Sequence, residues 1–375
     1  MLENIYRNFK SYWKDIDKTI FLSFFSLFVL GIFFSFASTS SLAGERLNKD
    51  YYFFFSKHLI FSICSILMMI IISWLKINFL KRILFPIFLV LLIILCLVLF
   101  FGVEVKGSKR WLDLFFFRFQ PVEFLKPFFI VIIAKILSKE NLNPTNYSYF
   151  ISFLCLIAPC IILLNQPDVG QTILLVLSWI SMVFISGIKL IYILGFFGIA
   201  LIFIASILLL FPNKFSYVFK RVEVFFDPSK GERFQSTKAL DAIKEGGLTG
   251  QGMGEGTLKD NVPEAHTDYI ISVIAEEFGS IISIFLICIF LYISFRVIKF
   301  ALQENEKFIK IALCGLTSIL IFQTFIHIGV NTSLLPTTGM TLPFLSYGGS
   351  SMFGSAMLAG IIINLTKKNI NNENI

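Results

Sequence analysis

Long hydrophobic runs separated by shorter polar segments dominate this chain. A helix that crosses a bilayer needs roughly 20 mostly apolar residues. Runs of about this length occur at about 19–38, 54–75, 82–101, 121–138, 148–165, 169–187, 190–211, 269–296, 308–330 and 341–365. The run at 121–138 is the least apolar, because it carries Glu123, Lys126 and Lys135. The pattern predicts an all-α, polytopic membrane protein with about ten transmembrane helices.

The distribution of basic residues predicts how these helices are oriented. With ten spans, the short segments on one side of the membrane hold fifteen Lys and Arg residues, and the short loops opposite hold six. Because basic loops stay in the cytoplasm, both termini are expected there. Small residues that could pass for a signal-peptidase site follow the first run, but nine more runs come after it. We interpret the first run as an uncleaved anchor.

The predicted organisation has five parts. These are a cytoplasmic segment at 1–18, helices one to seven at 19–211, a large periplasmic loop at 212–268, helices eight to ten at 269–366 and a cytoplasmic tail at 367–375. The large loop holds eight basic residues, nine acidic residues and many aromatic ones. This mixture predicts a small folded cap and not a disordered linker.

Composition excludes an ordinary soluble domain. The 375 residues are 56% hydrophobic and 15% charged, with a mean hydropathy of +0.81. The net charge of +8 is explained by membrane orientation, so no nucleic-acid partner is expected. All six cysteines fall inside apolar runs without a C-x-x-C pair, which favours packing over a disulfide framework or a zinc site.

The short loop between the third and fourth runs is the exception to the charge pattern. It places Lys106, Lys109, Arg110 and Arg118 on the exterior side, beside Trp111, whose indole suits a membrane interface. Two interpretations stay open. The loop either lies solvated near anionic headgroups or forms a basic lip that binds an anionic ligand.

The end of the large loop carries alternating glycines and an acid-rich segment. The glycines between Gly246 and Gly256 lack a preceding strand and a G-K-[ST] ending, so a nucleotide-binding loop is rejected. They predict either a tightly turning surface loop or a movable flap. His266, beside Glu264 and Asp268, is either a proton carrier or a hydrogen-bonded structural residue.

Asp268, Ser272 and Glu276 follow each other at i, i+4 spacing, which puts them on one helical face. Glu276 would lie roughly 12 Å deeper along the axis, and a carboxylate at that depth should face the bundle interior or a water-filled cavity. Asp268 is either the N-cap of the eighth helix or a reactive acid at its exterior mouth. No metal triad can be assembled from the three histidines by spacing.

The start of the fourth run combines Gln120, Pro121, Glu123 and Lys126. Glu123 and Lys126 are an i, i+3 pair, which is either a self-neutralising ion pair or a means of holding the lysine toward an anion in a cavity. The tenth run starts with small and polar residues around Ser346, which suit close helix packing or the lining of a cavity.

Six blocks, in this order, resemble one known family over nearly the whole chain. They are Lys109-Arg110-Trp111; Gln120-Pro121 with Glu123 and Lys126; Gln166 to Gln171; Gly252 to Gly256 with Pro263 to Asp268; Ala275-Glu276-Glu277; and Leu335 to Ser351. The family is SEDS (shape, elongation, division, sporulation), bacterial cell-wall glycosyltransferases. The string Gly339 to Phe344, Gly-Met-Thr-Leu-Pro-Phe, is similar to the division branch, FtsW, whereas the elongation branch, RodA, usually reads closer to Gly-Leu-Pro-Leu-Pro-Phe.

The resemblance implies ten transmembrane helices, an exterior-facing cavity and an essential acid at Asp268. It implies polymerisation of lipid II into glycan strands with release of undecaprenyl pyrophosphate, in the bacterial inner membrane at the division septum. The implied partners are a class B, FtsI-like penicillin-binding protein and other division proteins. Two departures stand out: Val122 replaces the usual Ser, and the segment 112–117 lacks the glycine usually found before Gln120-Pro121.

The leading hypothesis makes Asp268 the catalytic base that deprotonates the acceptor sugar hydroxyl. Cations would stabilise the leaving pyrophosphate, with Lys109, Arg110 and Lys126 as candidates. The expected substrate-binding residues are Lys109, Arg110, Trp111, Glu123, Lys126, Glu264, His266, Glu276 and Ser346. No metal ligands are assigned, although Mg²⁺ or Mn²⁺ could bridge pyrophosphate oxygens. The alternatives are a lipid II flippase, a RodA-type polymerase and a non-catalytic division scaffold.

Overall fold

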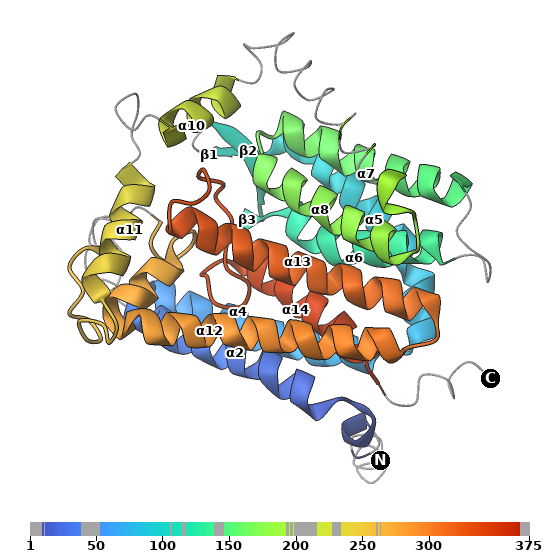
Figure 1. Ribbon diagram of the computed structural model, residues 1–375, viewed down its shortest axis with the longest axis horizontal. Helices are drawn as coiled ribbons and strands as arrows, with labels where there is room; N and C mark the ends of the chain where they lie inside the picture. The colour runs from blue at the N-terminus through green and yellow to red at the C-terminus, as the bar shows by residue number, and fades with distance from the viewer. Residues whose placement is uncertain are drawn as a thin grey trace.

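The computed structural model describes residues 10, 12–38, 53–105, 107–114, 118–138, 146–192, 195, 198, 216–226, 234–259, 262 and 264–367. Helices account for most of this part of the chain (Figure 1). Their bounds are α2 (Lys18–Ser38), α4 (Phe53–Trp74), α5 (Ile77–Phe101), α6 (Pro121–Leu137), α7 (Asn146–Asn165), α8 (Val169–Ile185), α10 (Ser216–Phe226), α11 (Phe234–Gly246), α12 (Ile270–Gln303), α13 (Lys307–Asn331) and α14 (Gly349–Leu365).

The helices confirm the predicted all-α, polytopic class. Six described helices are long and apolar enough to cross a membrane, namely those within α2, α4, α5, α7, α12 and α13, while α8 and α14 are apolar but shorter. The predicted run at 190–211 lies largely outside the described residues. The tenth helix begins at Gly349 and not at residue 341, because the segment 339–348 is not helical.

Apolar side chains cover the outside of the bundle as well as its core. In α5, Leu84 and Leu95 are buried, whereas Phe85 and Phe100 are 62% and 70% exposed. A water-soluble protein seldom exposes apolar surface on this scale. The outward face of α5 therefore suits contact with lipid or with another apolar helix.

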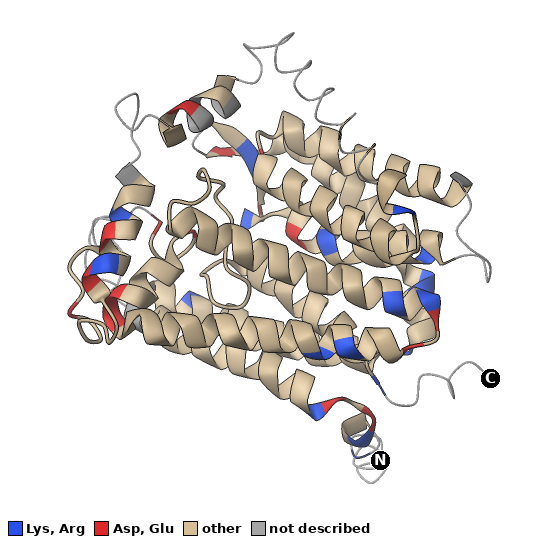
Figure 2. Cartoon of the chain, in the orientation of Figure 1, with Lys and Arg blue, Asp and Glu red and all other residues tan. Residues whose placement is uncertain are grey.

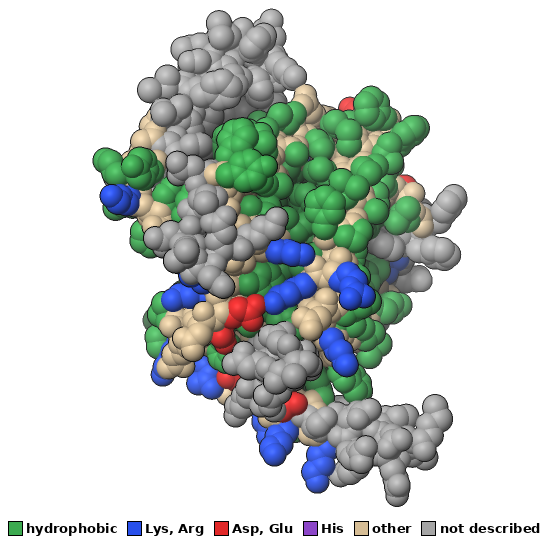
Figure 3. Space-filling model, turned by 90° about the vertical axis from the view of Figure 1, so that its right-hand side faces the viewer, with side chains coloured by type: hydrophobic (Ala, Val, Ile, Leu, Met, Phe, Trp, Pro, Cys, Tyr) green, Lys and Arg blue, Asp and Glu red, His purple; other side chains and the backbone are tan. Residues whose placement is uncertain are grey.

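The helix ends form two distinct faces. At the terminal end, where α2 begins and α14 ends, Tyr12 stacks on Trp74 and Lys367 lies over the Tyr12 ring. Lys81 of α5 and Glu306 before α13 form an ion pair of 2.7 Å there. Basic side chains gather at this end in Figure 2. Figure 3 views this end directly and shows the basic side chains spread across it among apolar ones.

The opposite end, here called the loop end, consists of the described residues within 102–120, 166–168, 247–269 and 332–348. It holds a small antiparallel sheet that the sequence analysis did not predict. The strands are β1 (Val103–Val105), β2 (Ser108–Asp113) and β3 (Arg118–Phe119), in the order β1-β2-β3. The sheet connects α5 to α6 and fixes which side chains of the basic loop point into the molecule.

The glycine-rich segment at the loop end folds back onto the start of α12. Gln251 N–H donates to the Glu276 carbonyl at 2.9 Å, and Gly252 N–H donates to the Glu277 carbonyl at 3.0 Å. A Cβ atom on Gly250, which has φ +82°, would lie only 2.2 Å from the Glu277 oxygen. Glycine is required because two backbones approach each other here. This close backbone contact explains why residue 250 is glycine, and no bound substrate is needed to explain it.

Candidate active site

Arg110 lies in the middle of β2 and is 92% buried, since only 8% of its surface is exposed. Its Nε donates to the Gln166 carbonyl at 3.2 Å, and its guanidinium also donates to the Pro167 carbonyl. Asp168 Oδ2 lies 3.7 Å from Nε. These contacts fasten the sheet to the turn between α7 and α8, and they fix the direction of the guanidinium.

Asp168 has a second role as the N-cap of α8. Its side chain accepts from the Gln171 N–H, and a negative charge is favoured at a helix N-terminus. Burial raises the pKa of Asp168, and the charge of Arg110 opposes that rise. Asp168 therefore orients Arg110 and holds the first turn of α8, where Gln171 lies.

The turn from Glu264 to Tyr269 carries Asp268. The Glu264 carbonyl accepts from the N–H groups of Thr267 and Asp268, at 3.0 and 3.1 Å, and the Glu264 carboxylate accepts from the Thr267 hydroxyl. Glu264 has φ +60°, a conformation that costs free energy and is often found at functional sites. The N-cap residue of α12 is Tyr269 and not Asp268. Glu264 therefore shapes the turn that positions Asp268.

Asp268 and Arg110 approach each other at Gly339. The position that a Cβ atom would take on Gly339 lies 3.4 Å from Asp268 Oδ2 and 4.0 Å from an Arg110 terminal nitrogen. Gly339 has φ +68°, which favours glycine. Three segments far apart in the sequence thus bring an acid, an arginine and a bare stretch of backbone to one place.

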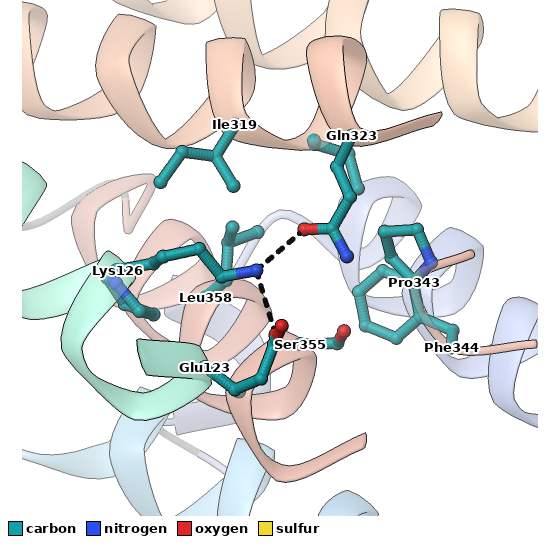
Figure 4. A pocket seen from close by; sticks show the side chains of 11 residues that line it. Glu123, Lys126, Ile319, Gln323, Pro343, Phe344, Ser355 and Leu358 are labelled. Atoms are coloured by element: carbon teal, nitrogen blue, oxygen red, sulfur yellow. Dashed lines mark hydrogen bonds and ion pairs between the residues drawn. The ribbon is translucent and has the colours of Figure 1, made fainter. Parts of the chain in front are cut away.

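A buried ion pair lies deeper in the bundle. Glu123 and Lys126 of α6 are each only 3% exposed and 2.8 Å apart. Gln171 of α8 donates to Glu123 at 2.7 Å, and Lys126 donates to Gln323 of α13 at 3.0 Å. Figure 4 shows the contacts of Lys126 with Glu123 and Gln323, beside Pro343 and Phe344, in a narrow pocket lined by Glu123 and Lys126. The ion-pair interpretation is thus confirmed, and the pair also lines a pocket.

Ser346 and His266 both support the turn that holds Asp268. Ser346 is buried, and its hydroxyl donates to the Thr267 carbonyl at 2.6 Å and accepts from the Leu342 N–H at 2.8 Å. The His266 ring lies 4.9 Å from Phe54 and 5.6 Å from Tyr347. Burial lowers the pKa of His266, opposed by the charge of Glu264. Burial therefore favours the neutral form of the imidazole.

Of the two surroundings that the sequence pattern allowed for Glu276, the protein interior and a water-filled cavity, the structure shows the buried one. Glu276 is fully buried, and its two carboxylate oxygens accept from the N–H groups of Leu258 and Lys259 at 2.7 and 2.8 Å. Lys259 also forms an ion pair with Glu277. This geometry assigns Glu276 to holding the glycine-rich segment on α12. A substrate contact for Glu276 stays a prediction.

Lys109 and Trp111 lie on the other face of β2 from Arg110, because side chains alternate along a strand. Lys109 pairs in register with Glu104 of β1, and its Cβ approaches Gly102 at the end of α5. The structure therefore separates Lys109 from Arg110, and charge alone could not have shown this. Substrate contacts for Lys109 and Trp111 stay predictions.

Several residues at the site were missed by sequence reasoning. The side-chain amides of three of them contact the charged residues described above: Gln171 bonds to Glu123, Gln323 to Lys126, and Asn331 to the Asp268 carbonyl. The fourth, Gly339, lies where Asp268 and Arg110 approach each other. Gln323 was hidden inside the apolar run at 308–330 and Asn331 directly follows that run, although the two share the i, i+8 spacing of one helical face. Among the described residues, no three side chains of His, Cys, Asp and Glu gather as metal ligands would.

These features define a class of protein: a helical membrane protein with a charged site at one end of its bundle and a buried ion pair beneath it. A family model, FtsW/RodA/SpoVE, described as "Cell cycle protein", matches residues 17–371. The chain belongs to this family.

Its relatives include two proteins named probable peptidoglycan glycosyltransferase FtsW. One, from Caulobacter vibrioides, is 36% identical over 95% of this chain and 90% of its own length. The other, from Haemophilus influenzae, is 32% identical over 98% of this chain and 96% of its own length. Both similarities extend over all six sequence blocks.

Two solved structures share the fold. One is a chain from a structure described as "Structural coordination of polymerization and crosslinking by a peptidoglycan synthase complex", with a TM-score of 0.77, 24% identity and coverage of 94% of this chain and 97% of that chain. The other is the rod shape determining protein RodA of Thermus thermophilus, with a TM-score of 0.69, 22% identity and coverage of 94% and 96%.

Proposed function

We propose that this chain is a peptidoglycan glycosyltransferase of the division branch, FtsW, which polymerises lipid II into glycan strands and releases undecaprenyl pyrophosphate. Family membership and the names of the relatives support this activity. The observation that carries the chemistry is the approach of Asp268 and Arg110 to Gly339. Glycosyl transfer needs a base that deprotonates the acceptor hydroxyl and a cation that stabilises the leaving pyrophosphate of the donor. Asp268 supplies the base and Arg110 supplies the cation.

Asp268 acts as the general base. A sugar hydroxyl is a weak nucleophile, so a carboxylate within hydrogen-bond reach takes its proton as the oxygen attacks the anomeric carbon of the donor. The bond between that carbon and the phosphate oxygen breaks, and the electron pair leaves with the pyrophosphate. A single displacement of this kind inverts the anomeric centre, so an α-linked donor gives a β linkage.

Arg110 stabilises the charge that develops on the pyrophosphate. A guanidinium can donate two parallel hydrogen bonds to phosphate oxygens. Arg110 is anchored by backbone carbonyls before substrate arrives, so little reorganisation accompanies the reaction. Lys126 is already bonded to Glu123 and Gln323, which leaves it to shape the pocket. A Mg²⁺ or Mn²⁺ ion would supply further charge, but we assign it no ligands and no step.

A lipid II flippase would need polar groups that continue toward the terminal end. On α6, the buried side chains after Lys126 are apolar from Pro127 through Ala134. The polar lining contributed by this helix therefore stops near the loop end, which favours an enzyme whose chemistry takes place there. A RodA-type polymerase would use the same residues, and the string Gly339 to Phe344 favours the division branch.

The proposed setting follows from the same family assignment. The loop end faces the periplasm, both termini lie in the cytoplasm and the chain acts in the bacterial inner membrane at the division septum. A class B, FtsI-like penicillin-binding protein crosslinks the product. A structural relative taken from a peptidoglycan synthase complex supports such a partner. Membrane lipids surround the apolar faces, and other division proteins complete the assembly.

The test uses the purified full chain with its penicillin-binding partner and labelled lipid II. Native protein should produce glycan ladders, and Asp268→Asn should produce none. Glu245→Gln, an exposed acid on α11, is the matched control and should polymerise like the native chain. Equal ladders from native protein and Asp268→Asn would overturn the assignment of the base.

A liposome experiment separates the enzyme from the flippase. Transbilayer movement of lipid II by a flippase should survive Asp268→Asn, because movement requires no base at this position. Movement without any ladder formation by the native chain, in the presence of the partner, would favour the transporter.

A further inference from the structure

One face of α13 carries three buried polar residues, Gln323, His327 and Asn331, spaced four residues apart. Their exposed fractions are 3%, 1% and 0%. Residues at this spacing lie on the same side of a helix. Buried polar groups are costly unless they are hydrogen-bonded, so three in a row need a physical reason.

Each member of the row donates a hydrogen bond to a backbone carbonyl at the loop end. Gln323 Nε2 donates to Thr341 O at 3.0 Å, and His327 Nδ1 lies 2.8 Å from Met340 O. Asn331 Nδ2 donates to Asp268 O at 3.1 Å. The first two carbonyls follow Gly339 directly, and the third belongs to the proposed base. The row therefore binds both segments that meet at Gly339.

The chemistry of the partners fixes the orientation of each side chain. Lys126 can only donate, so Gln323 must present its oxygen to the lysine and its nitrogen to Thr341. Figure 4 shows Gln323 extending from α13 toward Lys126. A carbonyl can only accept, so His327 must carry a proton on Nδ1. His327 Nε2 has no hydrogen-bond partner among the described residues.

We infer that Gln323, His327 and Asn331 are positioning residues that set the distance between the Asp268 carboxylate and the backbone at Gly339, and through it Arg110. This inference rests on the proposed function, because it assigns the row to the reaction in which Asp268 is the base. The hydrogen bonds that the row donates to the loop end all go to backbone carbonyls, and Gln323 also accepts from Lys126. The row therefore acts through Asp268 and Gly339 and not on substrate.

The buried ion pair acts through the same row. The lysine ammonium holds the Gln323 oxygen, which leaves the Gln323 amide nitrogen directed at Thr341. The Glu123–Lys126 pair is thereby connected to Gly339 by two hydrogen bonds and two residues of chain. A change in this pair would therefore reach Gly339 through Gln323, although the pair lies away from Asp268.

The test compares His327→Leu with His327→Asn. The amide nitrogen of an asparagine can occupy nearly the place of Nδ1, and only the unpartnered Nε2 is lost. Turnover number and KM are measured with labelled lipid II and the penicillin-binding partner. His327→Leu should lower kcat about 10²-fold with little change in KM, the effect of misplacing a catalytic group by about 1 Å, and His327→Asn should recover most of that loss.

Two further variants make the result specific to the row. Asn331→Leu should lower kcat in the same way, because it releases the Asp268 carbonyl. Thr332→Val is the matched control on the next residue, since the Thr332 hydroxyl bonds only to carbonyls of its own helix. Thr332→Val should leave kcat and the thermal unfolding temperature unchanged.

The outcomes separate this inference from the proposed function. If His327→Leu and Asn331→Leu turn over like the native chain while Asp268→Asn is inactive, the positioning row is refuted and the base stands. If His327→Leu and His327→Asn lose kcat equally although both remain folded by thermal unfolding, the row is also refuted. If Asp268→Asn is active, the proposed base fails whatever the row does.

Discussion

The protein contains two pairs that each combine one acidic and one basic side chain, and the two pairs are held together in different ways. Glu123 and Lys126 are three residues apart on one helix and form a direct ion pair of 2.8 Å. Asp268 and Arg110 come from distant segments and converge at Gly339. The first pair is brought together by the spacing on one helix, and Gln171 and Gln323 of neighbouring helices add hydrogen bonds to it. The second depends on a sheet, two turns and a helix face, so its spacing can be tuned for chemistry.

The largest expected effect is a loss of protein stability when the first pair is broken. Lys126→Met leaves the Glu123 charge buried, and we expect the free energy of unfolding to fall by about 3–5 kcal/mol. The double variant Glu123→Gln/Lys126→Met removes the stranded charge and should regain most of that loss. Thermal unfolding in detergent measures both. Equal losses in the two variants would show that charge burial is not the cause.

Arg110→Ala tests the second pair through activity. We expect turnover of lipid II to fall by about 10²- to 10³-fold, the usual effect of removing one preorganised donor to a developing negative charge. Lys109→Ala, on the opposite face of the same strand, should have a much smaller effect. Initial rates of glycan synthesis decide the matter. Comparable losses from both variants would contradict the separation of these residues by the strand.

Gly339→Ala tests the meeting point. The positive φ costs an alanine about 1–2 kcal/mol, and its methyl group would lie 3.4 Å from Asp268 Oδ2, in direct contact with the carboxylate. Gly107→Ala is the matched control, because Gly107 has φ +76° and nothing within 4 Å of a Cβ atom. Both variants should lose similar stability in thermal unfolding, and only Gly339→Ala should also lose turnover. Full activity in Gly339→Ala would show that this contact is irrelevant.

The smallest expected effect comes from Ser346→Ala. Its hydroxyl joins the Thr267 carbonyl to the Leu342 N–H, and leaving these groups unpaired should cost about 1–3 kcal/mol of stability. Ser294→Ala is the control, since the Ser294 hydroxyl bonds only to its own helix. Thermal unfolding should distinguish the two. Identical unfolding temperatures would remove Ser346 from the support of the Asp268 turn.

The sequence was sufficient for most of the long helices that the structure describes and for the contact within the first pair. Apolar runs locate helices because a bilayer imposes a length, and the i, i+3 spacing of Glu123 and Lys126 on a helix implies their contact. The sheet at 103–119 was missed because its strands are short and lie in a loop with no clear alternation. The late start of α14 was missed because Leu342, Phe344 and Leu345 extend the apolar run ahead of the helix.

The second pair could be predicted only in part. Asp268 and Arg110 were singled out by chemistry and by resemblance, but their approach at Gly339 depends on tertiary structure. Lys109 and Arg110 looked equivalent until the strand placed them on opposite faces. The partners of Glu276 could not be predicted, because the backbone amides that bind it belong to a loop that sequence patterns do not place. The row on α13 had a readable period of four, hidden by apolar neighbours.

The most direct measurement of the central claim is the initial rate of lipid II polymerisation by three chains: native, Asp268→Glu and Asp268→Asn, each with the penicillin-binding partner at saturating substrate. A base contributes about 10²- to 10⁴-fold, so Asp268→Asn should lose at least that factor, and Asp268→Glu, which keeps a displaced carboxylate, should fall between the other two. An Asp268→Asn rate equal to that of Asp268→Glu or of the native chain would contradict the account.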